Sequence, residues 1–139
     1  MNTRRLIKLS ALVLGFVVVG GLGYAVGQQN APTETKGLTV VKTGALDLSQ
    51  ELDKVQGRFL RLRVVSLEPG GVISQHTHDG RPGVAYVLSG TLTEHRGDQA
   101  TERKAGDVWV EGKDVTHWAE NKGAEAVVIV ATDVFKQGM

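Results

Sequence analysis

The sequence predicts an all-β domain, and three observations support this class. The 139 residues include 18 glycines but only three prolines, a composition that favours many tight turns. Short apolar runs recur along the chain, and turn residues separate them at intervals of roughly eight to twelve residues. One run, 58–67, alternates apolar and charged residues with the period of two that a half-buried strand shows. These features are typical of a β-sandwich or a β-barrel.

Length and composition exclude several classes of protein. The chain is long enough for one domain, because two independent cores would need more residues. It has no cysteine, so disulfide scaffolds and cysteine-based metal or catalytic sites are excluded. The net charge of +1 gives no reason to expect a nucleic-acid partner. No phosphate-binding loop or organic-cofactor motif is present, so no cofactor-binding residue is predicted.

The first 27 residues predict an export signal. Arg4, Arg5 and Lys8 precede an uncharged apolar stretch over 9–26, which is the pattern of a secretory signal peptide. A small-x-small site at 25–27 would allow cleavage before Gln28. The alternative is an uncleaved signal-anchor helix, since residues 9–26 reach the lower length limit for a membrane span. Either way, the rest of the chain is expected to be periplasmic or extracytoplasmic, secreted or anchored to the inner membrane.

A polar linker over 28–37 and a folded domain over 38–139 follow this segment. Removing residues 1–27 takes away three basic residues and no acidic one, which changes the net charge from +1 to −2. The domain is therefore not expected to bind nucleic acid or anionic lipid. Membrane contact is expected from the N-terminal segment alone, at least transiently.

The domain contains eight predicted strands and one weak helix candidate over 49–55. In the strand 58–67, Leu60 and Leu62 are expected to face inward. Arg61 and Arg63 are expected on the opposite face, either solvated or packed against a second subunit. A turn is expected at 68–71, where a proline precedes two glycines. The predicted strands are 38–42, 58–67, 72–74, 84–88, 91–94, 108–110, 116–118 and 126–134.

Three histidines have the spacing of metal ligands. His76 and His78 are separated by one residue, so in a strand both side chains point to the same face. His117 lies 39 residues after His78, in another predicted strand. Three imidazoles that converge in this way can occupy three corners around a divalent ion such as iron, manganese, nickel or zinc. The sequence therefore predicts a metal site formed by His76, His78 and His117.

The residues around these histidines resemble the two motifs of the cupin superfamily, over roughly 58–134. The run 86–90, Tyr-Val-Leu-Ser-Gly, is also similar to the family's sequence. The resemblance to small single-domain bacterial cupins implies a double-stranded β-helix (jelly-roll) barrel, a metal on the three histidines, and a homodimer paired through its sheets. The matching positions are Gly70, His76, His78 and Gly90 in the first motif, and Gly106, His117 and Asn121 in the second. In the second motif, Gly112 stands at the usual proline and Asp114 at the usual next glycine, both in a turn.

One departure from the family pattern affects the chemistry of the site. Gly83 stands where cupins usually have a glutamate ligand. Three neutral imidazoles would leave a divalent ion its full charge of +2 and open positions for an anionic, chelating substrate. In this respect the site resembles that of some cupin dioxygenases, which use iron on three histidines. Asp79 could replace the carboxylate, although strand alternation points it the opposite way.

Two readings stay open for several other residues. Arg81 is either an anchor for a substrate carboxylate or a solvated partner of Asp79. The aromatic residues Tyr86, Trp109 and Trp118 either line a pocket or pack in the core or a dimer interface. Among the remaining polar residues, His95 is expected to be exposed in a hairpin, and Asn121 is expected to hydrogen-bond a turn.

These observations lead to one function hypothesis and two alternatives. The first is an exported or membrane-anchored cupin that binds a divalent metal through three histidines. It would act on a small anionic or oxygenated molecule in a dioxygenase- or isomerase-like reaction, with no further catalytic residue assigned. The alternatives are a non-catalytic small-ligand-binding or sensing module at the cell envelope, and a structural dimerising domain with an empty pocket.

Overall fold

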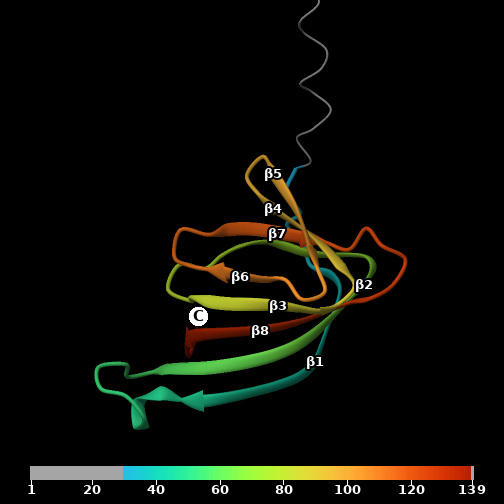
Figure 1. Cartoon of the computed structure of the whole chain (residues 1–139). Coiled ribbons are helices and arrows are strands. Elements are labelled where there is room, and N and C mark those ends of the chain that lie inside the picture. Colours follow the sequence, from blue (N-terminus) through green and yellow to red (C-terminus); the bar gives the residue numbers. More distant parts are fainter. Residues whose placement is uncertain (1–29, 139) are drawn as a thin grey trace, which may run out of the picture.

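The computed structural model describes residues 30–138, so the signal peptide or anchor predicted for 1–27 lies outside the described residues. This part of the chain contains eight strands and one short 3₁₀ helix (Figure 1). None of its helices is long and apolar enough to cross a membrane. The elements are β1 Lys36–Asp47, the 3₁₀ helix Leu48–Gln50, β2 Arg58–Thr77, β3 Gly83–Ser89, β4 Thr91–Arg96, β5 Gln99–Lys104, β6 Val108–Glu111, β7 Thr116–Glu120 and β8 Val127–Lys136.

The strands form a nearly closed antiparallel barrel, which confirms the all-β prediction. Their hydrogen-bonded order is β5-β4-β7-β2-β8-β3-β6, and β1 also pairs with β2. Figure 1 shows β2 bending at one end of the barrel, where it passes from the layer of β1 and β8 to the layer of β7. Because β2 belongs to both layers, the residues near its end lie in the layer of β7. Their side chains can point into the barrel, towards the layer of β8.

The bend in β2 corrects the turn predicted at 68–71. The strand continues through this segment and only changes partner: Leu67 pairs with β8, whereas Val72 pairs with β7. Gly70 has a positive φ of 72°, which favours glycine and lets the strand curve. Backbone hydrogen bonds join the bend to Asn121, from Gly70 N to Asn121 O and from Asn121 N to Gly71 O, both 2.9 Å. The proline and glycines therefore bend the strand and do not end it.

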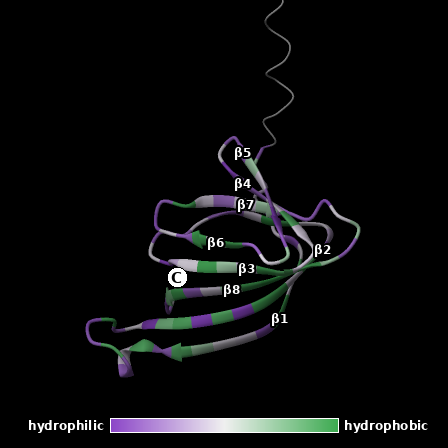
Figure 2. Cartoon of the chain, in the orientation of Figure 1, coloured by the Kyte–Doolittle hydropathy of each residue, from purple (hydrophilic) through white to green (hydrophobic). Residues whose placement is uncertain are grey.

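The orientation predicted for the first half of β2 is wrong. Leu60 and Leu62 are 38% and 44% exposed on the outer face, whereas Arg61 and Arg63 face inward, towards the buried Asp133. Figure 2 shows the alternation of hydrophilic and hydrophobic residues along this part of the strand. Arg61 donates two hydrogen bonds to Asp133 of β8, at 2.9 and 2.7 Å. The buried carboxylate stabilises the inward arginines, which explains why the apolar side chains occupy the outer face.

Three further elements differ from the prediction. The strand expected over 38–42 is the longer β1, Lys36–Asp47. The helix candidate over 49–55 is reduced to the 3₁₀ turn Leu48–Gln50, which Asp47 caps by accepting a hydrogen bond from Ser49 N. The strand β5 was not predicted, because its sequence is polar and mostly exposed on both faces.

The hydrophobic core lies between the layers of the barrel. It combines alternate residues of the paired strands with the indole of Trp109. The histidine cluster lies beside this core, in a cavity that polar side chains and several of the core residues line together. The buried core residues are Val65, Leu67, Ala85, Val87, Leu92, Trp109, Ala119, Val127 and Ile129.

Candidate metal centre

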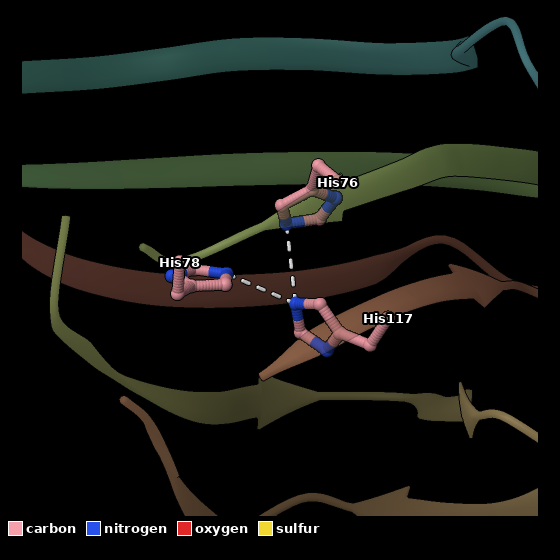
Figure 3. A group of neighbouring side chains, drawn as sticks. All are labelled: His76, His78 and His117. Carbon is pink, nitrogen blue, oxygen red and sulfur yellow. Dashed lines mark hydrogen bonds between the residues drawn. The ribbon is translucent and has the colours of Figure 1, made fainter. Parts of the chain in front are cut away.

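The three predicted histidines meet inside the barrel. His76, near the end of β2, pairs directly with His117 of β7, and His78 follows the last residue of β2. The Nε2 atom of His117 lies 3.0 Å from Nε2 of His78 and 3.1 Å from Nε2 of His76 (Figure 3). One ring nitrogen from each residue falls within 4.8 Å of the others. The structure thus brings together all three residues that the spacing predicts.

Each ring is held through its other nitrogen. His76 Nδ1 donates to the Ser74 carbonyl at 2.8 Å, and His78 Nδ1 donates to the Arg81 carbonyl at 3.2 Å. His117 Nδ1 donates to a carboxylate oxygen of Glu94 at 2.7 Å. A carbonyl or carboxylate oxygen can only accept, so in each neutral ring the proton resides on Nδ1. In the neutral form of each ring, Nε2 therefore carries a lone pair that points towards the other two Nε2 atoms.

This donor set fits a divalent metal ion. Lone pairs at 3.0–3.1 Å repel one another, and a cation bound by all three would remove that repulsion. Burial lowers the pKa of His76, and it lowers the pKa of His78 to about 4. Both rings are thus neutral near pH 7, the state in which an imidazole can bind a metal. Nδ1 hydrogen bonds to carbonyl and carboxylate oxygens are also typical of metal-bound histidines.

Glu94 orients His117 and was missed by the sequence analysis. It lies in β4, 1% exposed, and also accepts hydrogen bonds from Arg96 and twice from Arg103 at 2.7–2.9 Å. Burial alone would raise the pKa of Glu94, but hydrogen bonds from His117, Arg103 and Arg96 outweigh it and lower the pKa to about 2. The alternation of Leu92 and Glu94 on one strand face was a signal that this carboxylate points inward.

A cavity of about 300 Å³ opens beside the histidines. Part of its wall is apolar, including Ile73, Leu92 and Ile129. Arg63 and Arg81 contribute positive charge to the same cavity. The Nε atom of Arg63 is buried and has no hydrogen-bond partner among the described residues. Burial, followed by the neighbouring charge of Arg61, lowers the pKa of Arg63.

Asp133 balances the arginines that approach the cavity. Its carboxylate is 3% exposed and lies 2.7 Å from Arg61, 3.4 Å from Arg63 and 3.5 Å from Arg81. Arg81 therefore lies at the cavity and is not a solvated partner of Asp79, which is exposed. The solvated face predicted for Arg61 and Arg63 is wrong because nothing local to β2 indicates the distant Asp133.

The remaining candidate residues have mixed outcomes. Trp109 lines the cavity, whereas Tyr86 is 38% exposed on the outer face. The expectation that His95 is exposed is wrong, because its ring stacks on Trp118 at 3.7 Å and its Nε2 lies 2.8 Å from Glu120. The structural role predicted for Asn121 is confirmed, since it is 1% exposed and bonds Leu67, Gly123 and Glu125.

The fold and the site together define a class of proteins: double-stranded β-helix barrels with a histidine cluster facing an internal cavity. The chain belongs to the cupin family, because residues 63–134, more than half of it, match the family model described as a cupin domain, Cupin_2. No curated protein sequence matches significantly.

Solved structures share the fold. An uncharacterised conserved protein with a double-stranded β-helix domain from Klebsiella pneumoniae has 28% identity and a TM-score of 0.52. That match covers 56% of this chain and 65% of the Klebsiella chain, slightly less than two thirds of its length. A predicted oxalate decarboxylase from Thermotoga maritima has 21% identity and a TM-score of 0.53, covering 76% and 94%. The Cnp3 cupin domain of Schizosaccharomyces pombe has 16% identity and a TM-score of 0.53, covering 83% and 74%. At 21% and 16% identity, the likeness shows the fold alone.

Proposed function

We propose that this cupin binds one divalent metal ion through His76, His78 and His117 and acts there on a small anionic or oxygenated molecule. The observation that carries the metal site is the convergence of three Nε2 atoms, each ring being oriented through Nδ1. Iron, manganese, nickel and zinc all accept imidazole ligands of this kind. A bound divalent ion supplies Lewis acidity to the oxygen atoms of a ligand.

Two arginines support an anionic ligand in this cavity, which two carboxylates, Glu94 and Glu111, also line. Arg63 and Arg81 line it together with the three histidines, and a guanidinium binds a carboxylate with a planar fork of N–H donors. The unpartnered Nε–H of Arg63 leaves a buried donor for such a ligand. The apolar wall of the cavity excludes water from the part of the ligand that the arginines do not bind. These residues bind and orient an anion beside the ion, which suits the dioxygenase- or isomerase-like chemistry expected from the sequence.

The experiment is a measurement of bound metal on the full-length gene product, purified without a polyhistidine tag. We expect about one divalent ion per chain by elemental mass spectrometry. His76→Ala and His117→Ala should lose it, because each removes one of the three converging donors. His95→Gln is the matched control, since this histidine lies outside the cluster and should leave the metal in place.

A second arm tests the ligand. Oxalate, the smallest dicarboxylate, should bind the metal-loaded protein, and Arg81→Ala should weaken that binding without changing metal content. A wild-type protein that neither contains nor takes up iron, manganese, nickel or zinc would contradict the proposed function. Ligand binding that survives both alanine variants at full strength would instead favour a non-catalytic binding module.

We also propose that the domain is exported, on the sequence pattern of residues 1–27. The mature protein would be secreted into the periplasm or held at the inner membrane by residues 9–26. The mass of the protein recovered from the cell envelope distinguishes these forms, since cleavage before Gln28 would remove the apolar segment.

Finally, we propose a homodimer that pairs through the outer face of the sheet. Support comes from exposed apolar residues on neighbouring strands, such as Val84 and Tyr86 in β3, which pair with Val110 and Val108 in β6. An apolar face of this kind on a soluble domain is typical of an interaction surface.

A further inference from the structure

A second buried carboxylate, Glu111, faces the histidine cluster and has no role in the three-histidine site. It lies at the end of β6 and is 7% exposed. Its Oε1 atom is 3.6 Å from Nε2 of His117, the atom on which the other two rings converge. Its Oε2 atom is 3.5 Å from Nδ1 of His78. The carboxylate thus approaches the cluster at the metal-facing nitrogen of His117.

Glu111 has far fewer partners than the other buried carboxylate of the site. Among the described residues it accepts one hydrogen bond, from Trp109 Nε1 to Oε1 at 3.0 Å. Glu94, by contrast, accepts four, three of them from arginines. A buried carboxylate is unfavourable unless a positive charge compensates it. Glu111 therefore has unused acceptor capacity directed towards the cluster, where a cation would complete its environment.

Gly83 provides the space that Glu111 occupies. The two residues are direct partners across the β3–β6 ladder. A Cβ atom at position 83 would lie 3.1 Å from Oε2 of Glu111 and 2.8 Å from the Thr132 carbonyl, both closer than ordinary contacts. A side chain at 83 would therefore press against the Thr132 backbone and would also require the Glu111 carboxylate to shift. Gly83, at the usual glutamate position, thus leaves room for the side chain of Glu111, its partner across the ladder.

We propose that Glu111 supplies the carboxylate ligand of the metal, in place of the glutamate absent from position 83. This inference rests on the proposed metal site and adds a fourth protein ligand to it. Donor atoms bound to one tetrahedral ion at about 2.0–2.1 Å are roughly 3.3 Å apart, and Glu111 Oε1 lies 3.6 Å from Nε2 of His117. Glu111 is not among the donors that all lie within 4.8 Å of one another, so its carboxylate would move towards the other two histidines when the ion binds. With this ligand, the centre carries a charge of +1 instead of +2. The charge would then make the centre a weaker Lewis acid than three imidazoles alone.

Trp109 is the positioning residue for this carboxylate. It lies two residues before Glu111, so both side chains point to the same face of β6. Its indole N–H holds Oε1 on the cavity side, and the guanidinium of Arg103 lies 5.6 Å above its ring centre. Metal ligands are commonly oriented by hydrogen bonds of this type.

The test compares zinc binding by the full-length protein and its Glu111→Gln variant. Glutamine retains the size of the side chain and can still accept from Trp109, so the fold is expected to persist. We expect the dissociation constant for zinc to rise at least about tenfold in the variant, as for loss of groups around metal sites. Glu102→Gln, which removes an exposed carboxylate in β5, should leave zinc affinity unchanged.

A crystal structure of the zinc-loaded protein shows whether Glu111 binds the zinc ion directly or only places a negative charge near it. The proposal predicts a Glu111 oxygen at about 2.0–2.2 Å from zinc. A zinc ion on the three histidines, with Glu111 still on Trp109 and beyond bonding distance, would overturn it. Unchanged affinity in Glu111→Gln, with binding lost in His117→Ala, would overturn this inference alone. A wild-type protein that binds no metal would overturn the proposed function as well.

Discussion

Glu94 is the residue that connects the histidine cluster to the charged residues around it. It holds His117 Nδ1 through one carboxylate oxygen and Arg103 through the other. Charge-assisted hydrogen bonds in a buried site are about twice as strong as neutral ones. The orientation of His117, and with it the position of its Nε2 atom, therefore depends on an ionised carboxylate at position 94.

The first prediction concerns the pH dependence that follows from this carboxylate. The pKa of Glu94 is about 2 in the folded protein, against 4.5 for an ordinary glutamate, which is the value expected in the unfolded chain. Its ionised form contributes about 3 kcal/mol of stability, fully present above pH 4.5 and lost as the pH falls towards 2. Urea unfolding of metal-free wild type and Glu94→Gln should show a difference of this size at pH 7. The difference should fall to less than half by pH 3.

The control is Glu102→Gln, because Glu102 is an exposed carboxylate and should change stability little at any pH. A difference between wild type and Glu94→Gln that is the same at pH 3 and pH 7 would contradict the assigned role of the ionised carboxylate.

At the scale of the elements, the contact between β3 and β6 determines how much room the site has. Gly83 and Glu111 face each other there, and Thr132 of β8 closes the other side of Gly83. The strand needs no positive φ at position 83, so the reason for glycine is space and not backbone conformation. This distinguishes Gly83 from Gly70 and Gly90, which have positive φ values.

The second prediction is that Gly83→Ala destabilises the fold by about 1–3 kcal/mol. Its methyl group would lie 2.8 Å from a backbone oxygen, and overpacking of this kind forces the strands apart. Gly44→Ala in β1 is the matched control, since a Cβ there meets nothing within 4 Å. That variant should be neutral or slightly stabilising, by about 0.4–1 kcal/mol. Urea unfolding midpoints measure both, and equal effects of the two substitutions would contradict the steric explanation.

At the scale of the whole molecule, the barrel separates two surfaces with different chemistry. Its inner face carries the histidines, two cavity arginines and the core, whereas much of its outer face is apolar. Exposed apolar residues lie on β3 and β6, and Leu60 and Leu62 of β2 are also exposed. In the sheet, β8 lies between β2 and β3. Exposure of so many large apolar residues is unfavourable for an isolated domain.

The third prediction is that the protein is a dimer, and that charged substitutions on this outer face dissociate the dimer into single chains. Light scattering should give the wild type twice the mass of one chain. The Val84→Glu, Val110→Glu double variant should have the mass of one chain, because these paired residues are 46% and 66% exposed in the monomer. Leu52→Glu, an exposed apolar residue outside the strands, should remain dimeric. A wild type with the mass of one chain would contradict the proposed homodimer.

Much of the architecture was predictable because its signals are local. Seven of the eight strands correspond to predicted apolar runs, and β5 was missed because its residues are polar on both faces. For the site, the histidine pair could be predicted from i, i+2 spacing, but Glu94 and Glu111 were missed. Each shares a strand face with a buried apolar residue, Leu92 and Trp109, and this pattern could have identified both.

By itself the sequence determined the all-β class and the set of three histidines. Strand period, turn spacing and the spacing within each motif act over a few residues, and the resemblance of the two motifs to one family joined His117 to the pair. Only the tertiary structure decided which face of β2 points inward, since that depends on Asp133, 72 residues after Arg61. It also decided which carboxylates meet the imidazoles, because Glu94 reaches His117 across 23 residues of chain. Buried charges find their partners through strand pairing, and the pairing of distant strands is a property of the closed barrel.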